Sequence, residues 1–229
     1  ASGLTLAAHK TGNSFVDLSH QLFVFFLDST VVHSGACIIN DILDRDLDSQ
    51  VEHIKNRPLA CGAVSVGGAC IFLVAHVAAS ILLLACSHEL TFRVGLIGIF
   101  PVHALYALMK RLVMNWGLPV AWMHTIGPYD LPMLSVLFCG TWSWTMIYDT
   151  IYGCTKDDVK ADICSTSLLF GSRVRFILTP FAVHLVGSLL VAGLWNNNGL
   201  SYFVISVFGA ALYLSWQLGT LNPDDPADC

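Results

Sequence analysis

Long apolar stretches separated by polar connections dominate the chain. A helix needs roughly 20 mostly apolar residues to cross the hydrocarbon core of a bilayer. Seven stretches approach that length: 18–39, 59–86, 90–109, 112–127, 131–148, 176–195 and 200–218. The fourth is short and contains Asn115 and Pro119, which is typical of a truncated or re-entrant helix. The pattern predicts an all-α fold, a polytopic transmembrane helical bundle with about seven spans.

Charged residues gather on one predicted side of the membrane. Threading the chain alternately across the bilayer puts the connections 40–58, 110–111, 149–175 and 219–229 on one side. That side receives nine of the 11 Lys and Arg and 12 of the 16 Asp and Glu. The basic excess predicts that this side is cytoplasmic or its equivalent, but the orientation rule does not require the acids. A face that holds both charges suggests a ligand that needs both.

Composition excludes several other classes of protein. The chain is 55% hydrophobic and only 12% charged, whereas soluble domains average roughly 25% charged residues. The net charge of -5 and the lack of a long basic run argue against nucleic-acid binding. The eight cysteines show no zinc-ligand spacing. We expect residues 1–229 to form a single transmembrane domain, and we expect this to be a fragment, because there is no initiator Met and the end is a polar stretch.

The segment that follows the first apolar stretch is rich in carboxylates. It reads Asn-Asp-Ile-Leu-Asp-Arg-Asp-Leu-Asp over residues 40–48. If the helix continues, Asp41, Asp44 and Asp48 share one face. Such oxygen ligands suit Mg²⁺, which is commonly held by one or two carboxylates plus substrate phosphates. Lys55 and Arg57 follow closely and are suited to phosphate oxygens. The alternative is an acidic, solvated connection between two helices.

A second acidic segment, residues 148–162, falls on the same predicted side. Within it, Asp158 and Asp162 are one helical turn apart and could face a shared metal. Two acidic segments at one cavity can hold a metal-bound diphosphate between them. Loss of that diphosphate would leave an allylic carbocation, which a water-poor membrane cavity would protect.

The order of these motifs resembles the UbiA superfamily of intramembrane prenyltransferases, including 4-hydroxybenzoate polyprenyltransferase and fungal aromatic prenyltransferases. The resemblance rests on N-D-x-x-D-R-D-x-D, K-N-R-P-L-x-x-G-x-V-S, Y-x-L-M-K-R, N-W-G, Y-D-T-I-Y and D-D-V-K-A, in that order between residues 35 and 229. It implies Mg²⁺ as the cofactor, a prenyl diphosphate and an aromatic acceptor as substrates, and a multi-pass location in the lipid bilayer. The expected membrane is that of the endoplasmic reticulum or the mitochondrial inner membrane.

The resemblance also implies roles for individual residues. The expected catalytic residues are Asp44, Asp48 and Asp158. The expected substrate-binding residues are Lys55, Arg57, Lys110, Arg111, Asp149, Tyr152 and Lys160. The expected metal ligands are Asn40, Asp41, Asp44, Asp48, Asp157, Asp158 and Asp162, the last standing in for an aspartate that the family places where this chain has Cys154.

Several functions fit these observations. The first is Mg²⁺-dependent transfer of a prenyl group to a hydroxybenzoate-like or polyketide aromatic, as in ubiquinone biosynthesis or secondary metabolism. A membrane terpene cyclase of the same superfamily would keep the metal site and let the carbocation attack its own chain. The altered second motif leaves open a catalytically impaired paralogue. A cation transporter or a non-catalytic membrane scaffold is the alternative outside enzymes.

Overall fold

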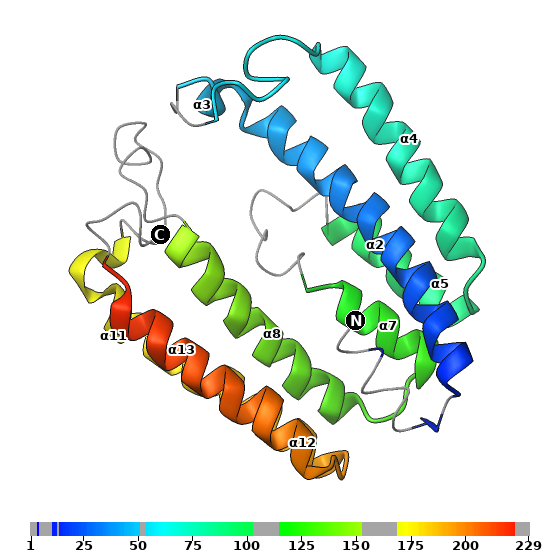
Figure 1. Cartoon of the computed structure of the whole chain (residues 1–229). Coiled ribbons are helices and arrows are strands. Elements are labelled where there is room, and N and C mark those ends of the chain that lie inside the picture. Colours follow the sequence, from blue (N-terminus) through cyan, green and yellow to red (C-terminus); the bar gives the residue numbers. More distant parts are fainter. Residues whose placement is uncertain are drawn as a thin grey trace. The chain divides into compact units, whose positions relative to one another are not determined.

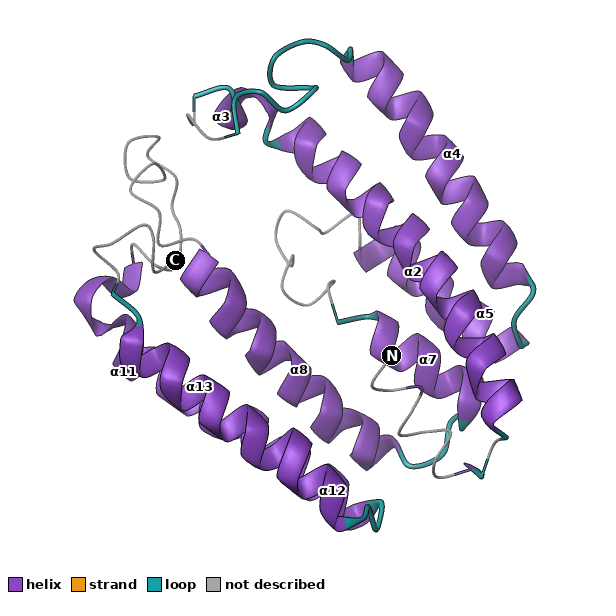
Figure 2. Ribbon diagram, viewed as in Figure 1, coloured by secondary structure: helices purple, strands orange, loops and turns teal. Residues whose placement is uncertain are grey.

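The computed structural model describes residues 4, 11–12, 14–50, 54–102, 115–152 and 169–222. These residues form helices, and no strand occurs among them (Figure 2). In chain order the elements are α2 (Phe15–Leu43), α3 (Arg45–Asp48), α4 (Val66–Ala85), α5 (Glu89–Ile97), the π-helix η1 (Gly98–Val102), α7 (Gly117–Thr125), α8 (Leu131–Tyr152), the 3₁₀-helix η2 (Gly171–Arg173), α11 (Val174–Trp195), α12 (Leu200–Tyr202), the π-helix η3 (Phe203–Phe208) and α13 (Gly209–Thr220). The predicted all-α class is confirmed.

The chain divides into two compact units. The first unit is Ala1–Asp130 and the second is Leu131–Cys229. Each unit has its own set of packed helices. The single domain expected for residues 1–229 stays a prediction.

In the first unit, α2 and α4 lie side by side and run in opposite directions (Figure 1). Gly35 is buried in this contact, where an added Cβ would lie 3.7 Å from His76 Cβ and 3.9 Å from Leu73 Cδ1. A serine begins each helix: Ser14 Oγ accepts a hydrogen bond from the backbone N–H of Asp17, and Ser65 Oγ accepts one from Gly68. These caps satisfy backbone donors that the first turn leaves unpaired.

The short helices α5 and α7 pack together in the same unit. Trp116 Nε1 donates a hydrogen bond to the carbonyl of Val94 at 2.9 Å, and Trp122 is buried, with its Nε1 donating to the carbonyl of Tyr129. With nine residues, α7 alone is shorter than the roughly 20 residues that a bilayer crossing needs, so a crossing by 112–127 stays a prediction.

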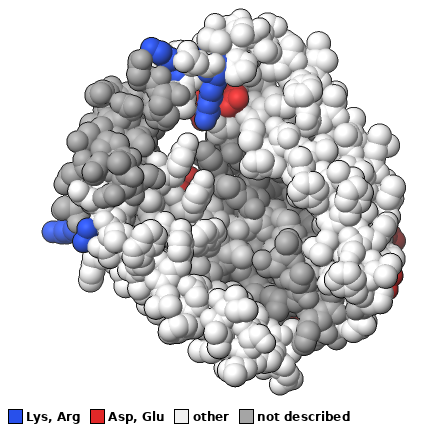
Figure 3. Space-filling model, viewed as in Figure 1, with Lys and Arg blue, Asp and Glu red and all other residues white. Residues whose placement is uncertain are grey.

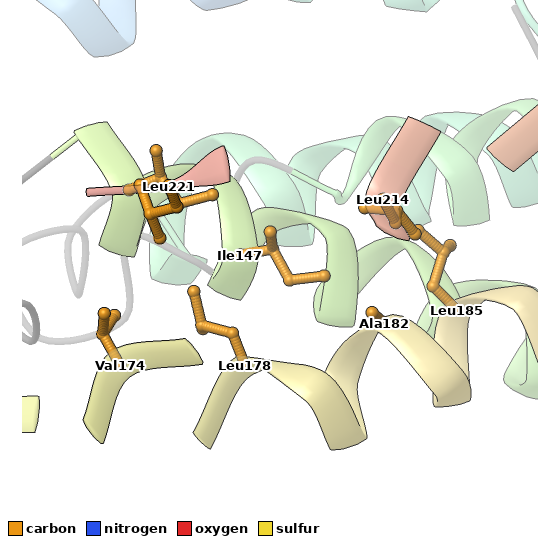
Figure 4. Packing of buried hydrophobic residues seen from close by; sticks show 8 residues of the cluster. Ile147, Val174, Leu178, Ala182, Leu185, Leu214 and Leu221 are labelled. Carbon is orange, nitrogen blue, oxygen red and sulfur yellow. The ribbon is translucent and has the colours of Figure 1, made fainter. Parts of the chain in front are cut away.

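The second unit has an apolar core shared by α8, α11 and α13 (Figure 4). Its buried side chains are Ile147, Ile151, Val174, Leu178, Ala182, Leu185, Leu214 and Leu221. A polar contact also joins α8 to α11, because Ser143 Oγ and His184 Nδ1 lie 2.7 Å apart. The guanidinium of Arg175 donates two hydrogen bonds to the carbonyl of Leu221, which lies just after α13. The core therefore fixes the end of α8, where Asp149 and Tyr152 lie.

Four of the described helical segments are long and apolar enough to cross a membrane: Phe15–Leu43, Val66–Ala85, Val174–Trp195 and Leu200–Thr220. Many large apolar side chains on them are exposed, including Phe26, Phe72 and Phe176. Contact with lipid explains such exposure, which is unusual in a water-soluble monomer. The chain is therefore an integral membrane protein, as predicted. Each of the seven predicted stretches contains helix, but a count of seven spans stays a prediction.

Candidate active site at the end of α2

The carboxylate segment begins inside α2 and continues into α3. The α-helix ends at Leu43, and Asp44 has φ -93° and ψ 2°, outside the helical values. Backbone hydrogen bonds from Asp44 to Asn40 and from Asp48 to Asp44, both 2.8 Å, carry the helical turn across this break. The expected uninterrupted helix is thus interrupted at one residue, while Asp41, Asp44 and Asp48 stay on successive turns.

Asp44, at the end of α2, lies on the side of that helix that faces away from α4. Gly35 marks the packed side of α2, and Asp44 follows nine residues later, which is about half a revolution at roughly 100° per residue. Within the first unit, therefore, the α2–α4 contact does not cover Asp44.

Arg57 joins the first and last of these carboxylates. Its Nη1 donates to Asp41 Oδ1 and to Asp48 Oδ2, each at 3.0 Å. The side chain of Asp48 is only 9% exposed, whereas those of Asp41 and Arg57 are 28% and 36% exposed. In Figure 3, acidic and basic atoms lie side by side near the end of α2, and most of the other described residues on this face carry no charge. Two oxygens thus converge on one cationic nitrogen.

A series of tight turns places Arg57 there. The Arg57 N–H bonds the carbonyl of Ile54, and the Arg57 carbonyl accepts from the N–H of Cys61, each at 2.9 Å. The carbonyl of Pro58 accepts a hydrogen bond from the N–H of Val64. Leu59 is only 7% exposed and anchors the segment. Lys55, two residues before Arg57, is exposed.

The donor set suits a hard cation such as Mg²⁺. Asn40, Asp41, Asp44 and Asp48 all offer oxygen atoms, and the Arg57 nitrogen shows that two of those oxygens can share one positive partner. Among the described residues, no group of three or more His, Cys, Asp or Glu is close enough to hold a metal alone. A metal here would therefore complete its coordination with ligand oxygens, as Mg²⁺ commonly does with phosphates.

The other described candidates lie at the end of α8, in the second unit. Asp149 is half-buried there, and Tyr152 is 59% exposed. The Tyr152 ring stacks on Tyr148, with centroids 6.1 Å apart and planes 18° apart. Their neighbours Thr150 and Ile151 are buried, so the helix presents a polar and aromatic face beside a packed one.

The remaining predicted site residues are outside the described residues. They are Lys110, Arg111, Asp157, Asp158, Lys160 and Asp162. Their roles stay predictions.

Sequence reasoning missed the pairing of Arg57 with Asp41 and Asp48. It assigned Arg57 to a phosphate because of residue type and nearness in sequence. The signal available was the excess of acid in residues 40–48, since carboxylates so dense need a neighbouring cation. Asp46, which was not assigned to the site, is exposed, and its backbone carbonyl accepts from Ser49 and Gln50.

Comparison with known proteins shows the family of the chain. The model of the UbiA prenyltransferase family matches residues 1–229. UbiA prenyltransferase claS of Ampulloclitocybe clavipes is 42% identical over 241 residues, covering 100% of this chain and 77% of that protein. The mitochondrial 4-hydroxybenzoate polyprenyltransferase of Schizosaccharomyces pombe is 34% identical, covering 99% of this chain and 67% of that protein.

The fold is also similar to a solved structure. A UbiA homolog from Archaeoglobus fulgidus, bound to DMAPP and Mg²⁺, superposes with a TM-score of 0.70 at 17% identity. The match covers 98% of this chain and 84% of that one. At this identity the likeness supports the fold, and the sequence relatives support the family. The chain is therefore a member of the UbiA prenyltransferase family, whose activity is the transfer of prenyl groups.

Proposed function

We propose that this chain transfers a prenyl group from a prenyl diphosphate to an aromatic ring, with Mg²⁺ as cofactor. The observation that carries the proposal is the convergence of Asp41 and Asp48 on Arg57 at the end of a membrane-spanning helix. Carboxylates and a guanidinium in one place suit a metal-bound diphosphate, and the apolar helix beneath suits a prenyl chain.

The carboxylate segment would hold the metal and the cations would hold the diphosphate. Asn40, Asp41, Asp44 and Asp48 supply oxygen ligands for Mg²⁺, which when bound offsets the negative charge that grows on the diphosphate as it departs. Lys55 contributes a point charge on a flexible stem, and Arg57 contributes a planar fork that can bind two phosphate oxygens.

The reaction then proceeds by ionisation and capture. The bond between C1 of the prenyl group and the diphosphate oxygen breaks, and the electron pair leaves with the diphosphate. A ring carbon of the acceptor gives a pair of π electrons to C1. The ring regains aromaticity when the proton on that carbon passes to the departed diphosphate, which serves as the base. The apolar side chains of α2 and its neighbours limit water, which would otherwise trap the carbocation.

The sequence predicts further residues of the site beyond the first carboxylate segment. We propose that five further residues bind the substrate: Asp149, Tyr152, Lys160, Lys110 and Arg111. We propose that Asp157, Asp158 and Asp162 add metal ligands. Asp158 joins Asp44 and Asp48 in the catalytic set. This requires both acidic segments to lie on the same membrane face, as the alternating threading predicts.

A hydroxybenzoate-type or polyketide aromatic is the proposed acceptor. The support is that one relative is named a 4-hydroxybenzoate polyprenyltransferase and that the fungal relative is named a UbiA prenyltransferase. Because the first of these is described as mitochondrial, the mitochondrial inner membrane is one proposed location and the endoplasmic reticulum the other.

Binding of a labelled prenyl diphosphate tests the proposal. Protein in lipid nanodiscs, with Mg²⁺ and radiolabelled geranyl diphosphate, should bind the label, and Asp44→Ala should weaken binding by more than about tenfold. Asp46→Ala is the matched control. It removes an exposed carboxylate that lies two residues after Asp44. Equal binding by the wild type and Asp44→Ala, or an equal loss in Asp46→Ala, would remove the carboxylate segment from the mechanism.

Product analysis then separates transfer from cyclisation. With 4-hydroxybenzoate added as a probe acceptor, we expect a prenylated aromatic that is absent when the acceptor is omitted. A terpene hydrocarbon or terpenol formed without any acceptor would indicate a cyclase instead. Binding of the diphosphate with no product under either condition would favour an impaired paralogue.

A further inference from the structure

The Arg57 guanidinium occupies a position that a metal ion would need. Asp41 Oδ1 and Asp48 Oδ2 both contact the same Nη1 at 3.0 Å, across sequence separations of 16 and 9 residues. Both carboxylates belong to the predicted metal-binding segment. The contact is therefore between the substrate-binding cation and the ligands of the metal.

This contact is more specific than an ordinary surface ion pair. Exposed pairs between long flexible side chains contribute little. Here the Asp48 side chain is 9% exposed, and Arg57 lies in a turn held by backbone hydrogen bonds on both sides and anchored by the buried Leu59. A nearly buried carboxylate requires a counter-charge, and Arg57 supplies it.

A metal ion and the guanidinium cannot share these two oxygens. Mg²⁺ binds oxygen at about 2.0–2.1 Å, so a metal on these two oxygens would lie against the Arg57 nitrogen, and the two positive charges would repel each other. For the metal to bind Asp41 Oδ1 and Asp48 Oδ2 together, the Arg57 side chain must move to another anion. Diphosphate is such an anion, because guanidinium binds phosphate oxygens through two parallel hydrogen bonds.

We propose that Arg57 is an internal counter-ion whose displacement makes metal binding depend on the diphosphate. With no diphosphate, Arg57 holds Asp41 and Asp48 and weakens binding of a divalent cation. When a diphosphate arrives, the guanidinium transfers from the carboxylates to phosphate oxygens, and the two carboxylates become available to the metal. Arg57 thus acts as a positioning residue that couples the two binding events. The inference rests on the proposed function and adds an order of binding to it: the diphosphate binds before the metal takes up the two carboxylates.

The test measures metal binding without catalysis. Mn²⁺ replaces Mg²⁺ as the probe, inorganic pyrophosphate replaces the prenyl substrate, and protein-bound Mn²⁺ in nanodiscs is measured by equilibrium dialysis. For the wild type we expect weak binding of Mn²⁺ alone and clearly tighter binding with pyrophosphate. Arg57→Gln should bind Mn²⁺ alone about tenfold more tightly, as expected when a positive charge in contact with the site is removed. The same variant should lose most of the gain from pyrophosphate.

Arg45→Gln is the matched control for loss of charge. Arg45 lies in the same acidic segment, as the first residue of α3, but it is exposed, and within the described part of the chain it is not the cation that pairs with Asp41 or Asp48. A general electrostatic effect would raise Mn²⁺ affinity equally in both variants, whereas the counter-ion role predicts a much larger rise in Arg57→Gln. Arg57→Lys retains the charge without the fork, so it should bind Mn²⁺ alone as weakly as the wild type while pyrophosphate helps less.

Three outcomes would overturn the inference. Arg57→Gln could bind Mn²⁺ no more tightly than the wild type, or Arg45→Gln could gain as much Mn²⁺ affinity as Arg57→Gln. The third is tight binding of Mn²⁺ alone by the wild type. Thermal unfolding shows whether Arg57→Gln is folded. If it is not, Arg57→Met removes the same charge, keeps an apolar stem and gives the same decision. Failure of the proposed function looks different, because the wild type would then bind neither Mn²⁺ with pyrophosphate nor the labelled geranyl diphosphate.

Discussion

Asp48 illustrates how a single side chain joins stability to function. Its carboxylate is almost buried and is held by Arg57 at 3.0 Å. The same oxygen is a proposed metal ligand, so a residue needed for binding is also needed for local structure. Substitutions in this segment therefore have to be compared with a control that affects only charge.

At the residue scale, Asp48→Ala should destabilise the protein by about 1–3 kcal/mol. A charge-assisted hydrogen bond is lost, and of its two carboxylate contacts Arg57 retains only the one with Asp41. Asp46→Ala, at an exposed position, should change stability by no more than about 0.5 kcal/mol. Thermal unfolding in detergent checks both. Equal shifts for the two variants would mean that the Arg57 contact contributes nothing measurable.

Asp28 presents the opposite case, a carboxylate inside a membrane-spanning helix. Its Oδ1 atom is buried and has no hydrogen-bond partner among the residues that the structure describes. An unpaired polar atom in apolar surroundings costs about 1–3 kcal/mol. Asp28→Leu should therefore raise the midpoint of thermal unfolding and leave prenyl transfer unchanged. Loss of activity in a folded Asp28→Leu protein would instead place this carboxylate in the reaction.

Helix contacts set what each element tolerates. In α8, a Cβ at Gly140 would lie 2.7 Å from Ser188 Cβ on α11, closer than such atoms approach in proteins. In α11, a Cβ at Gly187 would meet no atom of the described residues within 4 Å. The two glycines thus differ in environment although both lie in apolar helices.

This difference gives a prediction at the scale of elements. Gly140→Ala should destabilise the second unit by about 1–3 kcal/mol, since α8 and α11 must separate or shift. Gly187→Ala should be neutral or should stabilise by up to about 1 kcal/mol, as expected from helix propensity. Parallel thermal unfolding of both variants is the measurement. A larger loss in Gly187→Ala than in Gly140→Ala would contradict the packing of α8 on α11.

The helices were largely predictable from the sequence, and the details of the site were not. Apolar length marks α2, α4, α11 and the last helical segment, because a bilayer imposes that length on any spanning helix. The break at Asp44 was missed, since hydropathy carries no information about a helix terminus. The Arg57 contact was missed for a similar reason: it depends on the turns between Ile54 and Val64, which have no periodic pattern.

At the scale of the whole molecule, the proposed mechanism requires the two acidic segments, 40–48 and 148–162, to lie at the same membrane face. In the first unit, α4 has Cys61 and Arg57 before its start and Cys86 after its end, so these positions belong to opposite ends of a spanning helix. In the second unit, Tyr152 ends α8. Alternating threading, in which the short stretch 112–127 counts as one crossing, puts Cys61 and position 152 on the same side and Cys86 on the other.

Labelling of single cysteines from one side of the membrane tests this most directly. Three proteins are made in a cysteine-free background, retaining Cys61, retaining Cys86, or carrying Tyr152→Cys, and sealed vesicles are treated with a membrane-impermeant maleimide. The account predicts that Cys61 and Tyr152→Cys are labelled from the same side and Cys86 from the opposite side. Labelling of Cys61 and Tyr152→Cys from opposite sides would contradict it, because the two acidic segments could not then bind one magnesium diphosphate.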